Sequence, residues 1–381
     1  MTELPLRILQ VLEPSGGGSG RHFLDLCGAL ARRGHHVTAI YSPTRAEERF
    51  VAELRALPLA AVHVVPMTRS PSPSDTRAWL AIQKIIRSDG PFDIIHGHSS
   101  KAGALIRMRA PGRHIPRVYT PHAFRTMDPT LGAGGRQIFG GIESLFGNYL
   151  TDALICVSRD EYQHASENLG IPEDILHTVV NGVSAPPIGQ RQETRASLGV
   201  RPDAFVFGFV GRLSEQKAPE RLVDAFMRIA ADLQKAELAM IGFGPLEPEM
   251  RAMIGRSTMS ERIHLTAAIP GPEAMQAFDV LVMPSRYEAM SYVMLEAASA
   301  GLPMILADVG GATTVVEDNA NGFIVANNDD VTELAGRMRE IAGPQRYEAM
   351  RTAALARRDD YSLDKMVDAT EALYCMLAQD A

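Results

Sequence analysis

Short apolar runs alternate with helical stretches along this chain, and the alternation occurs twice. The first series contains the runs RILQVL, HVTAIY, VHVVPM, FDIIHGH, RVYTPH and ALICVS. Most of these runs are apolar throughout, which is typical of strands buried on both faces of a parallel sheet. The helical stretches between them supply the covering layers. The pattern therefore predicts an α/β fold.

A second series follows, with the runs FVFGFVG, ELAMIGFG, IHLTAA, VLVMPS and PMILAD. With 381 residues, the chain is long enough for two cores. We expect two doubly wound parallel-sheet domains, residues 1–185 and 186–362, joined through a Pro/Gly-rich linker at 181–190. The domains should face a cleft, with ligands bound at the carboxyl ends of the strands. Residues 363–379 repeat apolar positions seven apart, which predicts an amphipathic helix.

Composition excludes several classes of protein. The net charge of −7 argues against a nucleic-acid-binding protein, although the first half is mildly basic. No apolar stretch approaches 18 residues, so we expect neither a signal peptide nor a transmembrane helix. The three cysteines lack metal-ligand spacing and suit a reducing compartment. These features predict a cytoplasmic protein.

A glycine-rich loop, EPSGGGSGRHF, follows the first apolar run. It fails the dinucleotide-binding pattern because the third glycine would fall on Arg21 or Phe23. It also lacks the Lys-Ser/Thr pair of a phosphate-binding P-loop. Gly17 and Gly18 would still let backbone amides approach an anionic group at a helix start. A tight strand-to-helix turn with no ligand is the alternative.

Two cations flank a polar loop in the segment VGRLSEQKAPERL. Arg212 and Lys217 come between a strand ending at Gly211 and a helix starting near Pro219. This arrangement suits a diphosphate clamp, although two solvated side chains would give the same sequence. The Asp-x-Asp pattern is absent, so we expect no metal and assign the positive charge to side chains and helix ends.

Histidines gather at three strand ends, in HHV (residues 35–36), IIHGH (residues 96 and 98) and YTPHAF (residue 122). His96 and His98 lack a third ligand with recognisable spacing, which argues against a metal site. His122 follows Pro121 at a strand end, where it would face the cleft or serve the core.

The segment YEAMSYVMLEA places two carboxylates in an apolar window. Ser291 is a suitable N-cap, so Glu288 would lie on the preceding loop and Glu296 in the second helical turn. The backbone amides of residues 289–291 (Ala289, Met290 and Ser291) would point outward from the positive helix end, ready for an anion or hydroxyl groups. The alternative is a pair of buried, ion-paired carboxylates, for which Arg286 is a candidate partner.

Taken in order, these motifs resemble the retaining nucleotide-sugar glycosyltransferases of family 4, which have the GT-B fold. The resemblance spans nearly the whole chain and includes TPH, NGV, GRLSEQK, GFG and the two glutamates continuing into LEAASAGLP. It implies two Rossmann-like domains, metal-independent transfer from a GDP- or UDP-linked sugar, no further cofactor, and a C-terminal helix (residues 363–381) that returns to the first domain.

The resemblance also implies a role for each matching residue. Arg212 and Lys217 would bind the donor diphosphate, and Glu288 would contact the donor sugar hydroxyls. Glu296 would bind the ribose, and His122 would lie near the transferred sugar. Gly17 and Gly18 would approach phosphate or sugar, and Ser158 is a weaker match. The chain departs from the family pattern at Ala218, Ala289 and Thr314, where glycine, glycine and an acidic residue are common.

The reaction implied is sugar transfer to a hydroxyl of a glycan or lipid-linked glycan, in bacterial surface polysaccharide or lipopolysaccharide synthesis. A soluble small-molecule acceptor remains an alternative, as does a non-catalytic protein that binds nucleotide sugars. The basic stretch 101–117 and the segment GRQIFGGIESLFGNYL would give peripheral contact with the cytoplasmic membrane, or would simply pack on the sheet.

Overall fold

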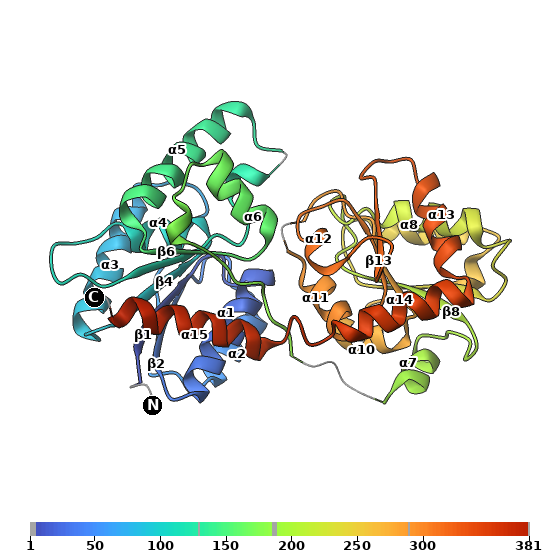
Figure 1. Ribbon diagram of the computed structural model, residues 1–381, viewed down its shortest axis with the longest axis horizontal. Coiled ribbons are helices and arrows are strands. Elements are labelled where there is room, and N and C mark those ends of the chain that lie inside the picture. Colours follow the sequence, from blue (N-terminus) through green and yellow to red (C-terminus); the bar gives the residue numbers. More distant parts are fainter. Residues whose placement is uncertain (1–4, 129, 185–188, 289, 380–381) are drawn as a thin grey trace. The chain divides into compact units, whose positions relative to one another are not determined.

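The computed structural model describes residues 5–128, 130–184, 189–288 and 290–379. The chain divides into two compact units, and each is described by itself (Figure 1). One unit comprises residues 1–182 and 363–381, and the other comprises residues 183–362. The expected domain boundary, between residues 185 and 186, lies outside the described residues. A parallel bridge joins Val183 and Ser362, the first and last residues of the second unit.

The first unit is built on a seven-stranded sheet in the order β3-β2-β1-β4-β5-β6-β7. All its strand pairs are parallel. The strands are β1 (Arg7–Leu12), β2 (His36–Tyr41), β3 (Ala61–Val64), β4 (Ile94–His98), β5 (Arg117–Thr120), β6 (Ala153–Cys156) and β7 (Leu176–Thr178). The chain runs outward from β1 in one direction and then in the other, which is the doubly wound arrangement.

Helices connect the strands of the first unit. They are α1 (Gly17–Arg32), α2 (Glu48–Ala56), α3 (Ser74–Ser88), α4 (Ser99–Arg107), α5 (Ala133–Leu150) and α6 (Arg159–Gln163). The short helices are η1 (Arg125–Met127), η2 (His164–Asn168) and η3 (Glu173–Ile175). Helix η2 has π-helical hydrogen bonding and continues directly from α6.

The second unit has a six-stranded sheet in the order β10-β9-β8-β11-β12-β13, again parallel throughout. Its strands are β8 (Phe205–Val210), β9 (Ala236–Ile241), β10 (Ile263–Thr266), β11 (Val280–Met283), β12 (Met304–Ala307) and β13 (Gly322–Val325). Its helices are α7 (Arg191–Ser197), α8 (Pro219–Ile229), α9 (Glu247–Gly255), α10 (Gly271–Ala274), α11 (Tyr292–Ser299), α12 (Ala312–Val315), α13 (Thr332–Ile341) and α14 (Pro344–Ala356), with the single turns η4 (Ser260–Arg262) and η5 (Met275–Ala277).

The chain ends in helix α15 (Leu363–Gln379), with the bounds that the seven-residue spacing predicts. Its apolar face belongs to the core of the first unit, where Met366, Val367, Leu373 and Tyr374 pack with residues of α1 and of the sheet. In Figure 1 this helix, in red, lies among the blue elements of the first unit. The last segment of the chain therefore completes the core that the first segment begins.

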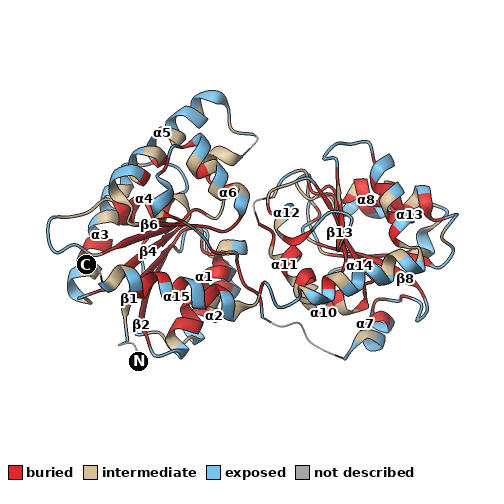
Figure 2. Cartoon of the chain, in the orientation of Figure 1, coloured by how far each residue is buried: buried red, intermediate tan, exposed pale blue. Residues whose placement is uncertain are grey.

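Burial follows the layers of each unit, with strands buried and the outer helix faces exposed (Figure 2). The two doubly wound, parallel-sheet α/β units that the sequence predicts are both present. Among the described residues, no helix combines the length and apolar character that a membrane crossing requires.

Candidate active site

In the second unit, the loop between β8 and α8 carries the two predicted cations. It is held by backbone hydrogen bonds to the loop after β9: the N–H of Leu213 donates to Phe243 O (3.0 Å), and that of Leu246 donates to Leu213 O (3.0 Å). Gly242 and Gly244 permit this approach. A Cβ on Gly242 would lie 1.9 Å from Gly211 O, and one on Gly244 would lie 2.3 Å from Leu213 O. The GFG motif thus supports the cationic loop.

Lys217 forms an ion pair with Glu288, and Nζ lies 2.5 Å from Oε1. Both side chains are mostly buried, with 14% and 7% exposed. Removing one partner would leave a charge in a site with little water, so the pair holds the two loops together. The predicted candidate partner Arg286 is not the residue that pairs with Glu288. It forms ion pairs with Glu220 and Asp329 instead.

Further hydrogen bonds join the same two loops. The N–H of Arg286 donates to Gln216 O (2.8 Å), and Gln216 Nε2 donates to Tyr287 O (3.1 Å). Arg212 lies at the start of the first loop and is exposed. Its side chain has no ion-pair partner in the described part of the chain. One paired cation and one exposed cation therefore share this loop.

Helix α11 begins directly after the loop that carries Glu288. Ser291 occupies its N-cap position with extended backbone angles (φ −81°, ψ 128°). Its side chain forms no capping hydrogen bond, so the predicted capping role is limited to the backbone. Met290 is buried, Glu296 lies half-buried in the second turn, and the predicted site residue Ala289 lies outside the described residues.

In the first unit, the glycine loop turns directly into α1. Gly17 has a left-handed backbone (φ +59°), and its N–H donates to Glu47 Oε1 at 3.1 Å. Gly17 and Gly18 are both exposed. A carboxylate of the protein thus takes one amide of this helix start, while Gly18 remains accessible.

Four histidines meet at the carboxyl ends of β4 and β5. His98 Nδ1 lies 3.1 Å from His122 Nε2, and the His96 and His98 rings are 4.0 Å apart. His22, on α1, joins them with its ring centre 4.6 Å from that of His122. His22 was not predicted, because a single histidine within a helix has no spacing signal. Its ring nitrogens are buried and find no partner at normal hydrogen-bond geometry among the described residues, although the nearby Asn181 side chain opposes the lowering of its pKa.

Burial keeps this cluster neutral. It lowers the pKa of His22 to about 4 and holds the pKa values of His96, His98 and His122 well below their usual range. The ligand atoms of His22, His98 and His122 lie within 4.8 Å of one another, so these neutral imidazoles are the group of described residues that could hold a cation. The sequence prediction had considered only His96 and His98 for this role.

A strained turn positions His122. His122 and Ala123 both have left-handed backbones (φ +53° and +80°), which is uncommon outside glycine. Glu161 holds the turn, because its Oε1 accepts from the N–H of Ala123 and its Oε2 from the N–H of Val157, both at 2.7 Å. Ser158 caps α6 by accepting from the N–H of Glu161 (3.2 Å). Ser158 therefore orients the residue that supports His122.

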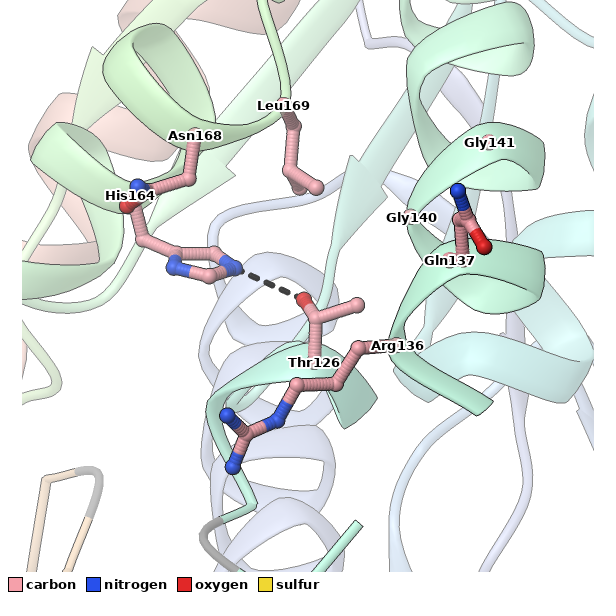
Figure 3. Close-up of a pocket in the computed structure, with 8 residues that line it drawn as sticks. All are labelled: Thr126, Arg136, Gln137, Gly140, Gly141, His164, Asn168 and Leu169. Atoms are coloured by element: carbon pink, nitrogen blue, oxygen red, sulfur yellow. Dashed lines mark hydrogen bonds between the residues drawn. The ribbon is translucent and has the colours of Figure 1, made fainter. Parts of the chain in front are cut away.

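A separate cavity of about 470 Å³ opens between η1, α5 and η2 (Figure 3). Thr126 Oγ1 and His164 Nε2, 2.7 Å apart, form one side of it. Arg136 and Gln137 extend from α5 on the other side, where Gly140 and Gly141 carry no side chain. Polar and apolar groups line the cavity in about equal measure, and Arg136 brings a cation to it.

The sequence matches two family models that follow the division of the chain. Residues 16–185 match the model described as Glycosyltransferase Family 4, and residues 204–343 match that described as Glycosyl transferases group 1.

Individual relatives are also named as glycosyltransferases. The chain is 28% identical to an Escherichia coli UDP-Gal:alpha-D-GlcNAc-diphosphoundecaprenol alpha-1,3-galactosyltransferase, with 67% of each chain covered. It is 27% identical to the D-inositol 3-phosphate glycosyltransferase of Jonesia denitrificans, over 94% of this chain and 91% of that one. The crystal structure of WaaG, a glycosyltransferase involved in lipopolysaccharide biosynthesis, superposes with a TM-score of 0.73 at 18% identity, covering 96% and 99% of the two chains.

Two parallel-sheet α/β units and the superposition on WaaG give the GT-B class of fold. The matches then give the family: the chain belongs to the family 4 glycosyltransferases.

Proposed function

We propose that this enzyme transfers a sugar, with retention of the α configuration, from a GDP- or UDP-linked donor to a hydroxyl of a lipid-linked glycan. The proposal of a nucleotide-sugar donor rests on the Lys217–Glu288 ion pair and on the exposed Arg212 in the same loop as Lys217. A nucleotide sugar has a doubly charged diphosphate and a polyhydroxyl ring. The two cations match the diphosphate, and the carboxylate matches the hydroxyl groups.

Breaking the anomeric bond develops negative charge on the departing diphosphate. In the proposed reaction, Lys217 and Arg212 stabilise that charge, together with the backbone amides at the start of α11. Glu288 accepts hydrogen bonds from the donor sugar and also holds Lys217 in place. Glu296 binds the ribose hydroxyls, and His122 contacts the transferred sugar. Gly18 offers an accessible backbone at the start of α1.

Donor binding in this proposal needs no metal ion, because side-chain cations neutralise the diphosphate. Turnover should therefore persist in EDTA. A requirement for Mg²⁺ or Mn²⁺, restored by adding the ion back, would contradict metal-independent transfer.

The acceptor proposal rests on the first unit. The cavity beside α5 has room for a sugar, and Arg136 provides a cation for a phosphate group. Four exposed apolar residues on α5, at helical spacing, form a stripe: Ile138, Ile142, Leu145 and Tyr149. A cavity with a cation, beside an apolar stripe, suits an acceptor held at the cytoplasmic membrane surface.

The relatives support both acceptor classes that the sequence left open. The E. coli relative is named for a diphosphoundecaprenol-linked sugar, and the Jonesia relative for D-inositol 3-phosphate. The apolar stripe on α5 favours the lipid-linked class over a soluble phosphate acceptor. In the cell the enzyme would then lie in the cytoplasm, in peripheral contact with the membrane.

A panel of UDP- and GDP-sugars, each assayed for nucleotide release with and without a lipid-linked glycan acceptor, tests the proposal. We expect release with one donor and stimulation by the acceptor. Donor binding without release, with every acceptor tried, would favour the alternative of a non-catalytic nucleotide-sugar-binding protein. Stimulation by inositol phosphate alone would favour the soluble acceptor.

A further inference from the structure

Arg286 holds the loop that carries the two candidate donor-binding cations. Its Nη1 donates a hydrogen bond to Glu215 O (2.8 Å), and its backbone N–H donates to Gln216 O (2.8 Å). These two carbonyl groups belong to the residues directly before Lys217. The sequence had made Arg286 a candidate partner of the Glu288 carboxylate. In the structure it holds the backbone beside the lysine that pairs with Glu288.

Two carboxylates fix the guanidinium of Arg286 on its other side. Its Nη2 lies 2.8 Å from Glu220 Oε1 and 3.0 Å from Asp329 Oδ1. Glu220 belongs to the first turn of α8, and Asp329 lies between β13 and α13. Asp329 also pairs with the mostly buried Arg221 of α8, at 2.8 Å from Nη2. All these residues belong to the second unit, so Arg286 joins the loop to the framework of its own domain.

The loop ends in a strained turn. Ala218 has a left-handed backbone (φ +47°, ψ +50°), which is disfavoured for a residue with a Cβ atom. The N–H groups of Lys217 and Ala218 both donate to Ser214 O, at 3.0 and 3.1 Å, and close the turn. The hydrogen bonds from Arg286 to the two residues in the middle of this turn oppose its opening.

The contact is too exposed to contribute much to the stability of the whole unit. The side chain of Arg286 is 35% exposed and that of Asp329 is 76% exposed. Exposed ion pairs contribute little to the free energy of unfolding, because water solvates both charges well. The effect of Arg286 is therefore local, on the conformation of the loop between β8 and α8.

We propose that Arg286 is a positioning residue, which holds the loop of residues 212–217 in the conformation that binds the donor, with Glu220 and Asp329 as its anchors. This role rests on the proposed function, in which the loop binds the diphosphate. A loop that is in place in only a fraction of the molecules lowers the apparent donor affinity by that fraction. Bound donor restores the loop, so losing Arg286 should raise the donor KM more than it lowers kcat.

The variant Arg286→Lys tests the geometry at constant charge, because lysine has one side-chain nitrogen where Arg286 uses two. We expect the donor KM to rise about fivefold, the worth of one hydrogen bond, with kcat nearly unchanged. The matched control is Arg339→Lys. Arg339 forms an exposed ion pair with Asp232 elsewhere in the same unit (2.9 Å), and its replacement should leave the KM as in the wild type.

The variant Asp329→Ala separates positioning from simple attraction between charges. It removes one anchor of Arg286 and also one negative charge from the site. Positioning predicts a higher donor KM, by about two- to fivefold, whereas charge attraction alone predicts a lower one. Asp232→Ala is the control for this variant. An unchanged KM in Arg286→Lys, or an unchanged or lower KM in Asp329→Ala, would overturn the proposal.

Hydrogen exchange of the full-length protein tests the loop without any donor. In Arg286→Lys, the amides of Lys217 and Ala218 should exchange about fivefold faster than in the wild type, while those of β8 keep their wild-type rates. Faster exchange spread evenly over the unit, or a lower thermal midpoint with wild-type exchange in the loop, would make Arg286 merely structural and the proposal wrong. A wild type that releases nucleotide from no donor would refute the proposed function instead, and the exchange rates would still decide whether Arg286 holds the loop.

Discussion

Glu161 is the buried carboxylate that holds the turn after His122. Burial raises its pKa to about 7 from an ordinary value of 4.5. Hydrogen bonds from the N–H groups of Val157 and Ala123 act in the opposite direction but are outweighed. Because the folded state binds this proton more tightly than the unfolded state, stability from this group is greatest below about pH 4.5. It is lost as the pH rises through about 7.

Glu161→Gln should remove this pH dependence. Between pH 4.5 and about 7 the free energy of unfolding of the wild type should fall by up to about 3 kcal/mol relative to the variant. Urea unfolding of the first unit at several pH values measures it. Glu167→Gln, at an exposed neighbouring position, is the control. Its free energy of unfolding should change with pH as that of the wild type does. If the free energy of unfolding of Glu161→Gln changed with pH as that of the wild type does, Glu161 would not be the source of the pH dependence.

From the sequence, the candidate site residues can be placed on their elements more readily than they can be paired with one another. Arg212, Lys217 and Glu288 could be placed at strand ends because the strand, loop and helix signals flanking them are local. That Lys217 pairs with Glu288 could not be predicted, since 71 positions separate the two in sequence. His22, Gln10 and Tyr374, which gather at the histidine cluster, were missed for the same reason. Each is an isolated residue inside a regular element, and only the packing of α1 and α15 on the sheet brings them together.

At the scale of elements, the loop after β9 depends on two glycines. Gly242→Ala would drive a Cβ against Gly211 O, so we expect a loss of about 1–3 kcal/mol in the stability of the second unit. Because the clash displaces the Arg212–Lys217 loop, turnover should fall as well. Gly255→Ala is the control: a Cβ there meets nothing within 4 Å, and α9 should tolerate or favour it. Wild-type stability of Gly242→Ala, measured by urea unfolding, would contradict this account.

Helix α5 exposes its apolar stripe to solvent. The double variant Ile138→Ser/Leu145→Ser should weaken binding to vesicles of anionic lipid at least about tenfold, because it removes apolar area from the contacting face. Stability should change little, since both side chains are exposed. Cosedimentation with vesicles measures the binding. Leu80→Ser, an exposed leucine on α3, is the control. Equal binding by all three proteins would show that this helix does not contact the membrane.

Helix α15 shows where element prediction from sequence works well. Apolar residues seven apart define one face over 17 residues, and the structure has that helix over residues 363–379. Four-residue helices such as α10 and α12 give no such signal, because they contain barely one turn. Strand β7, with three residues, is likewise too short for a pattern.

At the scale of the whole molecule, each unit has a core of its own, and the first needs the last helix of the chain. Val367 on α15 and Val223 on α8 are both fully buried, one in each core. Val367→Ala should destabilise the first unit by about 1–3 kcal/mol and leave the second unchanged. Val223→Ala should do the reverse. Hydrogen exchange resolved by unit measures both, and equal loss in both units for either variant would contradict separate cores.

The two-unit organisation followed from the repeated strand–helix alternation, because each series has enough apolar runs for one sheet. The strand order did not follow, since strands far apart in sequence become neighbours in a doubly wound sheet. Charge gave no clue either to the burial of the histidine cluster, whose four members come from α1, β4 and the turn after β5.

The central claim is that the Arg212–Lys217 loop binds and activates a nucleotide-sugar donor. Transfer from the preferred donor should be compared in the wild type, Lys217→Ala and the exposed control Lys235→Ala, with near-UV circular dichroism to confirm folding. The double variant Lys217→Ala/Glu288→Gln relieves any instability from an unpaired carboxylate. We predict a loss of about 10²–10³ in turnover for Lys217→Ala and for the double variant, and none for the control. Near-wild-type turnover by folded Lys217→Ala would contradict the account.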